Sequence, residues 1–107
     1  EGLVLYNASR VTEDNQPELF KSWDKIWIDE CYSAPKKYDV PWAASAWIGL
    51  NLLSVNPNLA IVDRKQKQLI EELNKHKIEV IPLELRHDRI ISGGFHCVTL
   101  DLSRKAK

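Results

Sequence analysis

The sequence of 107 residues predicts an α/β protein of about one domain's length, and three features of its second half carry this prediction. Two apolar segments, 47–55 and 59–62, flank an Asn-Pro-Asn turn and predict an antiparallel hairpin of two strands. An amphipathic helix follows them. A further strand at 78–85 completes the order strand, strand, helix, strand.

The elements before this unit are shorter. Residues 2–6 and 25–28 have the composition of strands, and residues 17–20 form one predicted helical turn with proline at its start. Residues 29–45 show no sustained period and predict a loop of about seventeen residues. Loops longer than about 12–15 residues are usually functional or disordered. Three aromatic residues favour a packed loop here: Tyr32, Tyr38 and Trp42.

The predicted helix has a start signal and a buried face. Asp63 is the expected N-cap, with Gln66 as its capping-box partner three positions later, and the helix is expected to end near Lys77. Pro82 limits the following strand to an edge or irregular position, because proline cannot donate a ladder hydrogen bond. The apolar stripe of the helix consists of Leu69, Ile70 and Leu73.

Cys97 is the leading candidate for a nucleophile. It follows Gly93 and Gly94, which allow positive φ and close backbone approach, and it precedes a segment of alternating polarity that predicts a strand. In that strand Cys97 would share one face with Thr99 and Asp101. The other face would point to the core through His96, Val98, Leu100 and Leu102. A buried packing cysteine is the alternative, because free cysteine often behaves as a small hydrophobe.

The composition excludes several classes of protein. Fifteen basic and fifteen acidic residues balance, which argues against an electrostatic surface for nucleic acid, and no apolar run is long enough to span a bilayer. Two cysteines are too few for a disulfide scaffold, so a soluble cytoplasmic protein with reduced thiols is expected. The three histidines and two cysteines fit no zinc spacing. The absence of methionine, even at position 1, suggests a piece of a longer protein.

Four runs of the sequence are informative together: the most specific is Gly-Gly-Phe-His-Cys-x-Thr-x-Asp at 93–101, and the others are 47–53, 59–63 and 78–82. They resemble the C-terminal end of glycine amidinotransferase and its bacterial relatives, which include amidinotransferases of cyanobacterial toxin pathways. The resemblance implies a pentein fold, in which five strand-strand-helix-strand modules surround a central channel. About two modules are then expected here: a partial one at 1–46 with the long loop, and a C-terminal one at 47–107.

The resemblance also implies an activity. The thiolate of Cys97 would attack the guanidinium carbon of arginine, ornithine would leave, and the amidino group would pass to an amine, glycine being the expected acceptor and guanidinoacetate the product. No cofactor is implied. Where the family shows Ser-Ser-Lys-Trp, whose serines help bind substrate, this chain reads Ala44-Ser45-Ala46-Trp47, so Ser45 alone is a candidate substrate contact.

The chain departs from the family at its acid–base histidine, which lies in a His-x-Asp motif. His76, His87 and His96 are followed two positions later by isoleucine, arginine and valine. The chain alone is therefore expected to be inactive, and to join the remainder of a parent chain or form a homo-oligomer. Two alternatives stay open. One is a non-catalytic binding or assembly module with the same ancestry, and the other is part of a guanidine hydrolase that uses water as acceptor.

Overall fold

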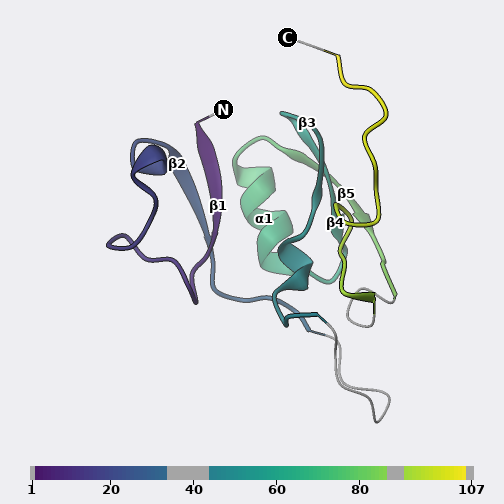
Figure 1. Ribbon diagram of the computed structural model, residues 1–107, viewed down its shortest axis with the longest axis horizontal. Coiled ribbons are helices and arrows are strands. Elements are labelled where there is room, and N and C mark those ends of the chain that lie inside the picture. Colours follow the sequence, from purple (N-terminus) through teal and green to yellow (C-terminus); the bar gives the residue numbers. More distant parts are fainter. Residues whose placement is uncertain (1, 34–43, 87–90, 106–107) are drawn as a thin grey trace.

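The computed structural model describes residues 2–33, 44–86 and 91–105, and shows two β-sheets with one helix packed against both (Figure 1). The first sheet holds two strands, β1 (Leu3–Asn7) and β2 (Asp24–Ile28). The second holds three, in the order β3-β4-β5, and the helix α1 (Lys67–Lys75) connects the last two of them. The predicted α/β class is confirmed.

The second sheet has the predicted topology. β3 (Leu53–Asn56) pairs antiparallel with β4 (Leu59–Asp63), and β4 pairs parallel with β5 (Glu79–Leu83). The hairpin and the order strand, strand, helix, strand are therefore confirmed. β5 lies at the edge of the sheet, as predicted. The missing N–H of Pro82 is tolerated there, because the outer side of an edge strand has no neighbour to which it would donate.

The first sheet is formed by parallel pairing of β1 and β2, which a long connection through the short 3₁₀ helix η1 (Glu18–Phe20) makes possible. Both strands and the helical turn after Pro17 were expected from the sequence. The rings of Tyr6 on β1 and Trp27 on β2 lie 4.9 Å apart between centroids and pack at 41°. The centre of the predicted loop at 29–45 lies outside the described residues, as does His87.

The start of α1 differs from the prediction, whereas its end lies within two residues of the expected Lys77. Asp63 is the last residue of β4, in register with Leu83, and its Oδ1 accepts the backbone N–H of Lys65 at 2.9 Å. The helix begins only at Lys67, so the predicted N-cap is wrong, and the side chain of Gln66 is engaged elsewhere. The helix ends at Lys75 because the chain turns into the left-handed region at Lys77, where φ is 61°.

The segment 47–52 also differs from the prediction, because it is no strand. Residues 48–50 form the 3₁₀ helix η2 (Ile48–Leu50), in which the N–H of Leu50 donates to the carbonyl of Trp47 at 3.0 Å. The apolar side chains here pack against the hydrophobic core rather than line a strand: Trp47, Leu50 and Leu52. An apolar run in the sequence is therefore compatible with a buried compact turn as well as with a buried strand.

The hydrophobic core lies where α1 meets the two sheets. Leu69 and Leu73 of the predicted stripe are buried, and the third member, Ile70, is half-buried. Burial of a leucine side chain contributes roughly 1.5–3 kcal/mol. The other members of the buried cluster are Ile26, Ile28, Ala60 and Val62, which come from β2 and β4.

Two glutamines at the start of α1 fix the chain that leaves β2. The amide of Gln66 accepts the backbone N–H of Tyr32 and donates to its carbonyl, both at 2.9 Å, much as a neighbouring strand would. The Oε1 of Gln68 accepts the N–H groups of Asp29 and Glu30, at 3.2 and 3.0 Å. Because Gln66 is only 4% exposed, this polar contact is part of the interior that joins the two sheets.

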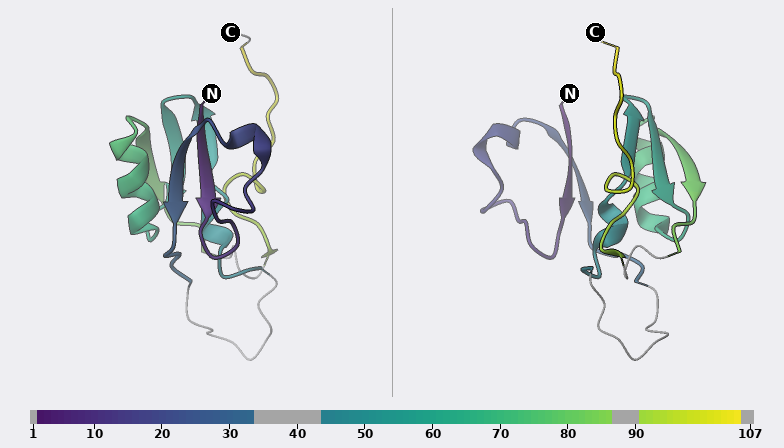
Figure 2. Two further views of the ribbon diagram at one scale, coloured as in Figure 1. Left: turned by 90° about the vertical axis from the view of Figure 1, so that its left-hand side faces the viewer. Right: turned by 45° about the vertical axis from the view of Figure 1, so that its right-hand side comes forward.

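The C-terminal segment does not form the predicted strand. Figure 2 shows residues 99–105 as an irregular trace that runs past β3 and ends beyond the sheets. The side chains expected to face the core are exposed: Val98 at 49%, Leu100 at 82% and Leu102 at 92%. Among the described residues, no helix has the length and apolar character needed to cross a membrane.

Candidate active site

The thiol of Cys97 is exposed on a turn, and the glycine pair beside it is buried. Neither Gly93 nor Gly94 uses the positive φ that glycine allows, and Ser92 before them has a φ of 59°. The glycines are required for a different reason, because neighbouring atoms leave no room for a side chain. Of the two properties that glycine allows here, the structure uses close backbone approach and not positive φ.

Gly94 lies directly against Asn51, the residue that follows η2. A Cβ built on Gly94 would stand 2.6 Å from both the Cβ and the backbone oxygen of Asn51, closer than real side chains approach. A Cβ on Gly93 would stand 2.9 Å from the Cβ of Cys97. The two glycines therefore let the loop fold under Cys97 and rest on Asn51.

Asn51 holds the backbone of this loop at two successive residues. Its side-chain Oδ1 accepts the N–H of Cys97 at 3.1 Å, and its backbone carbonyl accepts the N–H of His96 at 3.4 Å. Sequence analysis did not single out Asn51. The available signal was an asparagine in an otherwise apolar run at 47–53.

The residues after Cys97 close a turn in place of the predicted strand. The N–H of Val98 donates to the carbonyl of Gly94 at 3.2 Å. The hydroxyl of Thr99 lies 3.0 Å from the carbonyl of Phe95 and 2.9 Å from that of His96, and is directed back onto the turn. Cys97 and Thr99 consequently do not share a strand face, which corrects the prediction.

Asp101, the other residue expected beside Cys97, pairs with Arg104. The hydrogen bond from Arg104 holds the pKa of the Asp101 carboxyl below its usual range, and the positive charges of Arg104 and then His96 add to this. Arg104 also donates to the carbonyl of Ser54 on β3 at 2.9 Å. Asp101 therefore fastens the C-terminal segment to the second sheet.

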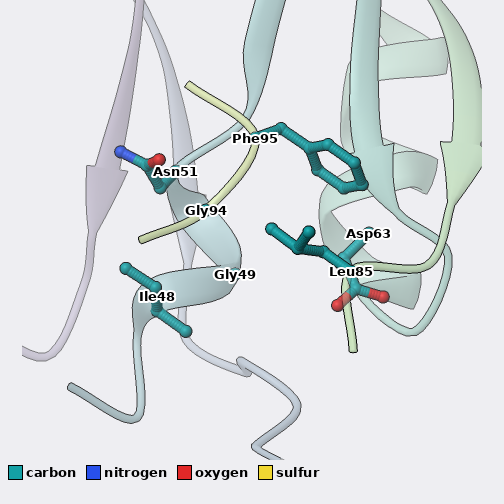
Figure 3. Close-up of a pocket in the computed structure, with 7 residues that line it drawn as sticks. All are labelled: Ile48, Gly49, Asn51, Asp63, Leu85, Gly94 and Phe95. Carbon is teal, nitrogen blue, oxygen red and sulfur yellow. The ribbon is translucent and has the colours of Figure 1, made fainter. Parts of the chain in front are cut away.

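A small pocket lies behind the loop. Its volume of about 10 Å³ is near the minimum that holds one water molecule, so it is no substrate site. Figure 3 shows Asn51 beside Gly94 and the ring of Phe95 on the opposite side of the loop, toward the pocket's far wall. The lining residues are Ile48, Gly49, Asn51, Asp63, Leu85, Gly94 and Phe95.

Ser45, the candidate substrate contact, is exposed, and its Oγ accepts the N–H of Trp47 at 3.1 Å. Ala44, which replaces the first serine of the family pattern, is buried. In the described part of the chain no hydrogen bond joins Ser45 to Cys97. Both nevertheless border η2, Ser45 just before it and Cys97 through Asn51 just after it.

Both cysteines are present as thiols. Within residues 2–33, 44–86 and 91–105, no group of three or more His, Cys, Asp or Glu side chains is placed to hold a metal ion. The arrangement assembled here is an exposed thiol on a turn with a fixed backbone. Such a group is suited to nucleophilic attack, provided that a base or positive charge supports the thiolate.

No protein-family model matches the sequence. The chain is 49% identical over 106 residues to the inosamine-phosphate amidinotransferase 1 of Streptomyces griseus, covering 99% of this chain and 30% of that protein. It is 31% identical over 106 residues to the mitochondrial glycine amidinotransferase of Xenopus tropicalis, covering 97% of this chain and 24% of that protein. Homologues of this chain are amidinotransferases.

The solved structures agree with this relationship. The structure of an inosamine-phosphate amidinotransferase from Streptomyces griseus superposes with a TM-score of 0.89 at 48% identity, over 99% of this chain and 30% of that one. The fold is therefore part of the pentein fold of amidinotransferases, as the sequence predicted. The chain spans about 30% of the length of the curated amidinotransferase that it matches at 49% identity.

The resemblance stated from the sequence holds for amidinotransferases as a class. Its finer assignment to glycine amidinotransferase is not supported, because identity to the inosamine-phosphate amidinotransferase is 49% and identity to the glycine amidinotransferase is 31%.

Proposed function

We propose that this chain supplies the nucleophile of an amidinotransferase, and that Cys97 carries the amidino group between a donor and an acceptor amine. The observation that carries the proposal is the exposed thiol of Cys97 on a loop fixed by Asn51, in a chain whose homologues are amidinotransferases. Ser45, on the segment that leads into η2, is proposed as a substrate contact. The donor is arginine, as the resemblance implies.

The reaction conserves atoms and charge in two displacements. The thiolate of Cys97 attacks the guanidinium carbon of arginine, and a bond forms between Sγ and that carbon while the bond from the carbon to Nε breaks. Ornithine leaves as the amine after taking a proton. The acceptor amine then attacks the same carbon, loses a proton, and displaces the thiolate. Transfer succeeds where the site favours the amine over water as second nucleophile.

We infer an amino-sugar-like phosphate, such as inosamine phosphate, as the acceptor in place of glycine. The higher identity to a protein with that name supports this choice. The buried Ala44 supports a change of substrate relative to the family pattern, because a methyl group cannot make the hydrogen bond of a serine hydroxyl. The proton donor for ornithine is expected in a His-x-Asp motif that these 107 residues do not contain, so the chain alone should be inactive.

The test uses the native gene product that carries this chain. Incubation with arginine alone should release ornithine once and leave an amidino group on the peptide that contains Cys97, seen by mass spectrometry. Cys97→Ser should abolish both results, and the matched variant Cys31→Ser should preserve them. Labelling of a residue other than Cys97 would contradict the assignment.

The acceptor is tested in a second reaction. The native protein loaded with arginine receives inosamine phosphate or glycine, and the guanidino product is measured. We expect faster turnover with inosamine phosphate. Turnover with glycine alone would contradict the proposed acceptor. Without any acceptor, steady formation of urea with ornithine, or of citrulline with ammonia, would identify a hydrolase instead.

A further inference from the structure

We propose that Asn51 is a positioning residue that orients the thiol of Cys97 for amidino transfer, and this proposal rests on the function proposed above. Asn51 does not contact substrate in this assignment. It acts through the backbone of the loop. The proposal follows from three observations: the two hydrogen bonds that Asn51 accepts, the rigid support beneath it, and the small number of other hydrogen bonds that hold the loop.

The first observation is the position of the two accepted bonds. One comes from the backbone N–H of Cys97 itself, at 3.1 Å to Oδ1, and the other from the preceding residue, His96, at 3.4 Å to the carbonyl. Fixing two successive amides determines the orientation of the peptide plane that precedes the Cα of Cys97. The bond from the N–H of Val98 to the carbonyl of Gly94 restrains the following peptide plane. The two planes together restrict the direction of the Cα–Cβ bond, from which the thiol turns only about χ1.

The second observation is that Asn51 is itself held from the opposite side. Its N–H donates to the carbonyl of Ile48 at 2.9 Å, which closes η2. Gly49 in η2 packs on the side chain of Gln66, so closely that a Cβ on Gly49 would stand 2.2 Å from Nε2. Gln66 in turn is bonded to both backbone groups of Tyr32. A continuous path of contacts therefore leads from the interior at the start of α1 to Cys97.

The third observation is that few other hydrogen bonds join the loop to the rest of the protein. In the described part of the chain, both hydrogen bonds that join residues 93–99 to another element end on Asn51. The remaining bonds of this stretch lie within the turn itself, between Gly94 and Thr99. Val98 is 49% exposed and adds little packing, whereas the half-buried ring of Phe95 lines the small pocket together with Leu85. Asn51 is thus the contact whose loss should change the loop and leave the core intact.

Two substitutions separate the geometric effect of Asn51 from an electrostatic one. Asn51→Ala removes the acceptor for the N–H of Cys97 and should lower kcat about tenfold to a hundredfold, because small misplacements of a reacting group have effects of that size. The KM for arginine should change less than about twofold. Asn51→Asp keeps an acceptor oxygen and adds a negative charge near the thiol, which raises its pKa. Activity should then recover at higher pH.

The experiment uses the native gene product and follows two readouts. The first is the rate of transfer from arginine. The second is the rate at which iodoacetamide alkylates Cys97 across a pH series, resolved by peptide mass spectrometry, and this readout does not require an active enzyme. Asn74 offers a matched control, because it is exposed on α1 and takes no part in the hydrogen bonds of the loop at residues 93–99. Asn74→Ala and Asn74→Asp should behave as the unmodified protein in both readouts.

The outcomes distinguish the two proposals. If the unmodified protein transfers no amidino group, the proposed function fails, and the alkylation profiles still decide whether Asn51 orients the thiol. The proposal is supported if Asn51→Ala loses kcat with an unchanged melting temperature, and Asn51→Asp shifts the alkylation profile to higher pH. It is overturned if both variants match the unmodified protein, or if both lose activity only together with a lowered melting temperature.

Discussion

The second sheet and the segment that carries Cys97 are held by different kinds of contact. In the sheet and its helix, the side chains of Val62 and Leu69 are almost fully buried, and the backbone groups are paired along β4. In the segment 91–105, Leu100 and Leu102 are exposed, and the hydrogen bonds that hold the chain to other elements end on Asn51, Ser54 and Val55. The comparison suggests that hydrophobic burial sets the stability of this protein, whereas a few hydrogen bonds set the geometry of its candidate nucleophile.

The largest effect that tests this comparison is on stability. Leu69→Ala should lower the free energy of unfolding by about 2–5 kcal/mol, because it removes a buried side chain and leaves a cavity between α1 and the sheets. Leu102→Ala is the matched control and should change it by less than about 0.5 kcal/mol, since that side chain is 92% exposed. Urea unfolding measures both. Equal effects at the two positions would remove the distinction between the regions.

A second prediction concerns the loop itself. Gly94→Ala forces a Cβ to within 2.6 Å of the Cβ and carbonyl oxygen of Asn51, so the loop must move away from η2. We expect a cost of about 1–3 kcal/mol in the free energy of unfolding, typical of overpacking. Amide hydrogen exchange at His96 and Cys97 should accelerate, because their bonds to Asn51 lengthen.

The control for this variant is Ser103→Ala, an exposed position in the same segment. Exchange at the amides of β4 should remain slow in both variants, because the strand is paired on both sides. Acceleration confined to β4, with His96 and Cys97 unaffected, would show that Gly94 supports the sheet instead of the loop.

The sequence predicted the second sheet and its helix better than the loop that carries Cys97. The hairpin, the buried face of α1 and the edge position of β5 were predictable, because turn residues, helical periodicity and Pro82 are local signals. The contact between Asn51 and Cys97 joins residues 46 positions apart, and a single sequence holds no local signal for such a pair. The exposed thiol itself was part of the sequence prediction, but the support beneath it was not.

The predicted strand at 98–102 failed for a related reason. Alternating polarity describes side chains, whereas a strand also needs a neighbour with unpaired backbone groups. In the described residues this segment pairs with none, and its fixed points are Thr99 on the turn and Arg104 on β3. The sequence also did not indicate which residue of this loop takes a positive φ. That residue is Ser92, whereas Gly93 and Gly94 are needed because a side chain would not fit.

The smallest expected effect is electrostatic and lies at the far end of the segment. Because Arg104 lowers the pKa of Asp101 in the folded state, the stabilisation from this pair is present above the ordinary carboxyl pKa of about 4. It is lost as the pH falls through the lower value of the folded protein. Arg104→Gln should raise the pKa of Asp101 toward its ordinary value, as followed by NMR titration of the carboxyl carbon.

His96→Gln is the matched control for this titration, because the charge of His96 contributes less to the lowered pKa of Asp101 than Arg104 does. A larger shift from His96→Gln than from Arg104→Gln would place His96, and with it the turn of Cys97, as the main electrostatic partner of Asp101. The segment would then be fastened through the candidate active-site loop rather than through β3, and the separation between a rigid sheet and a loop held chiefly by Asn51 would no longer stand.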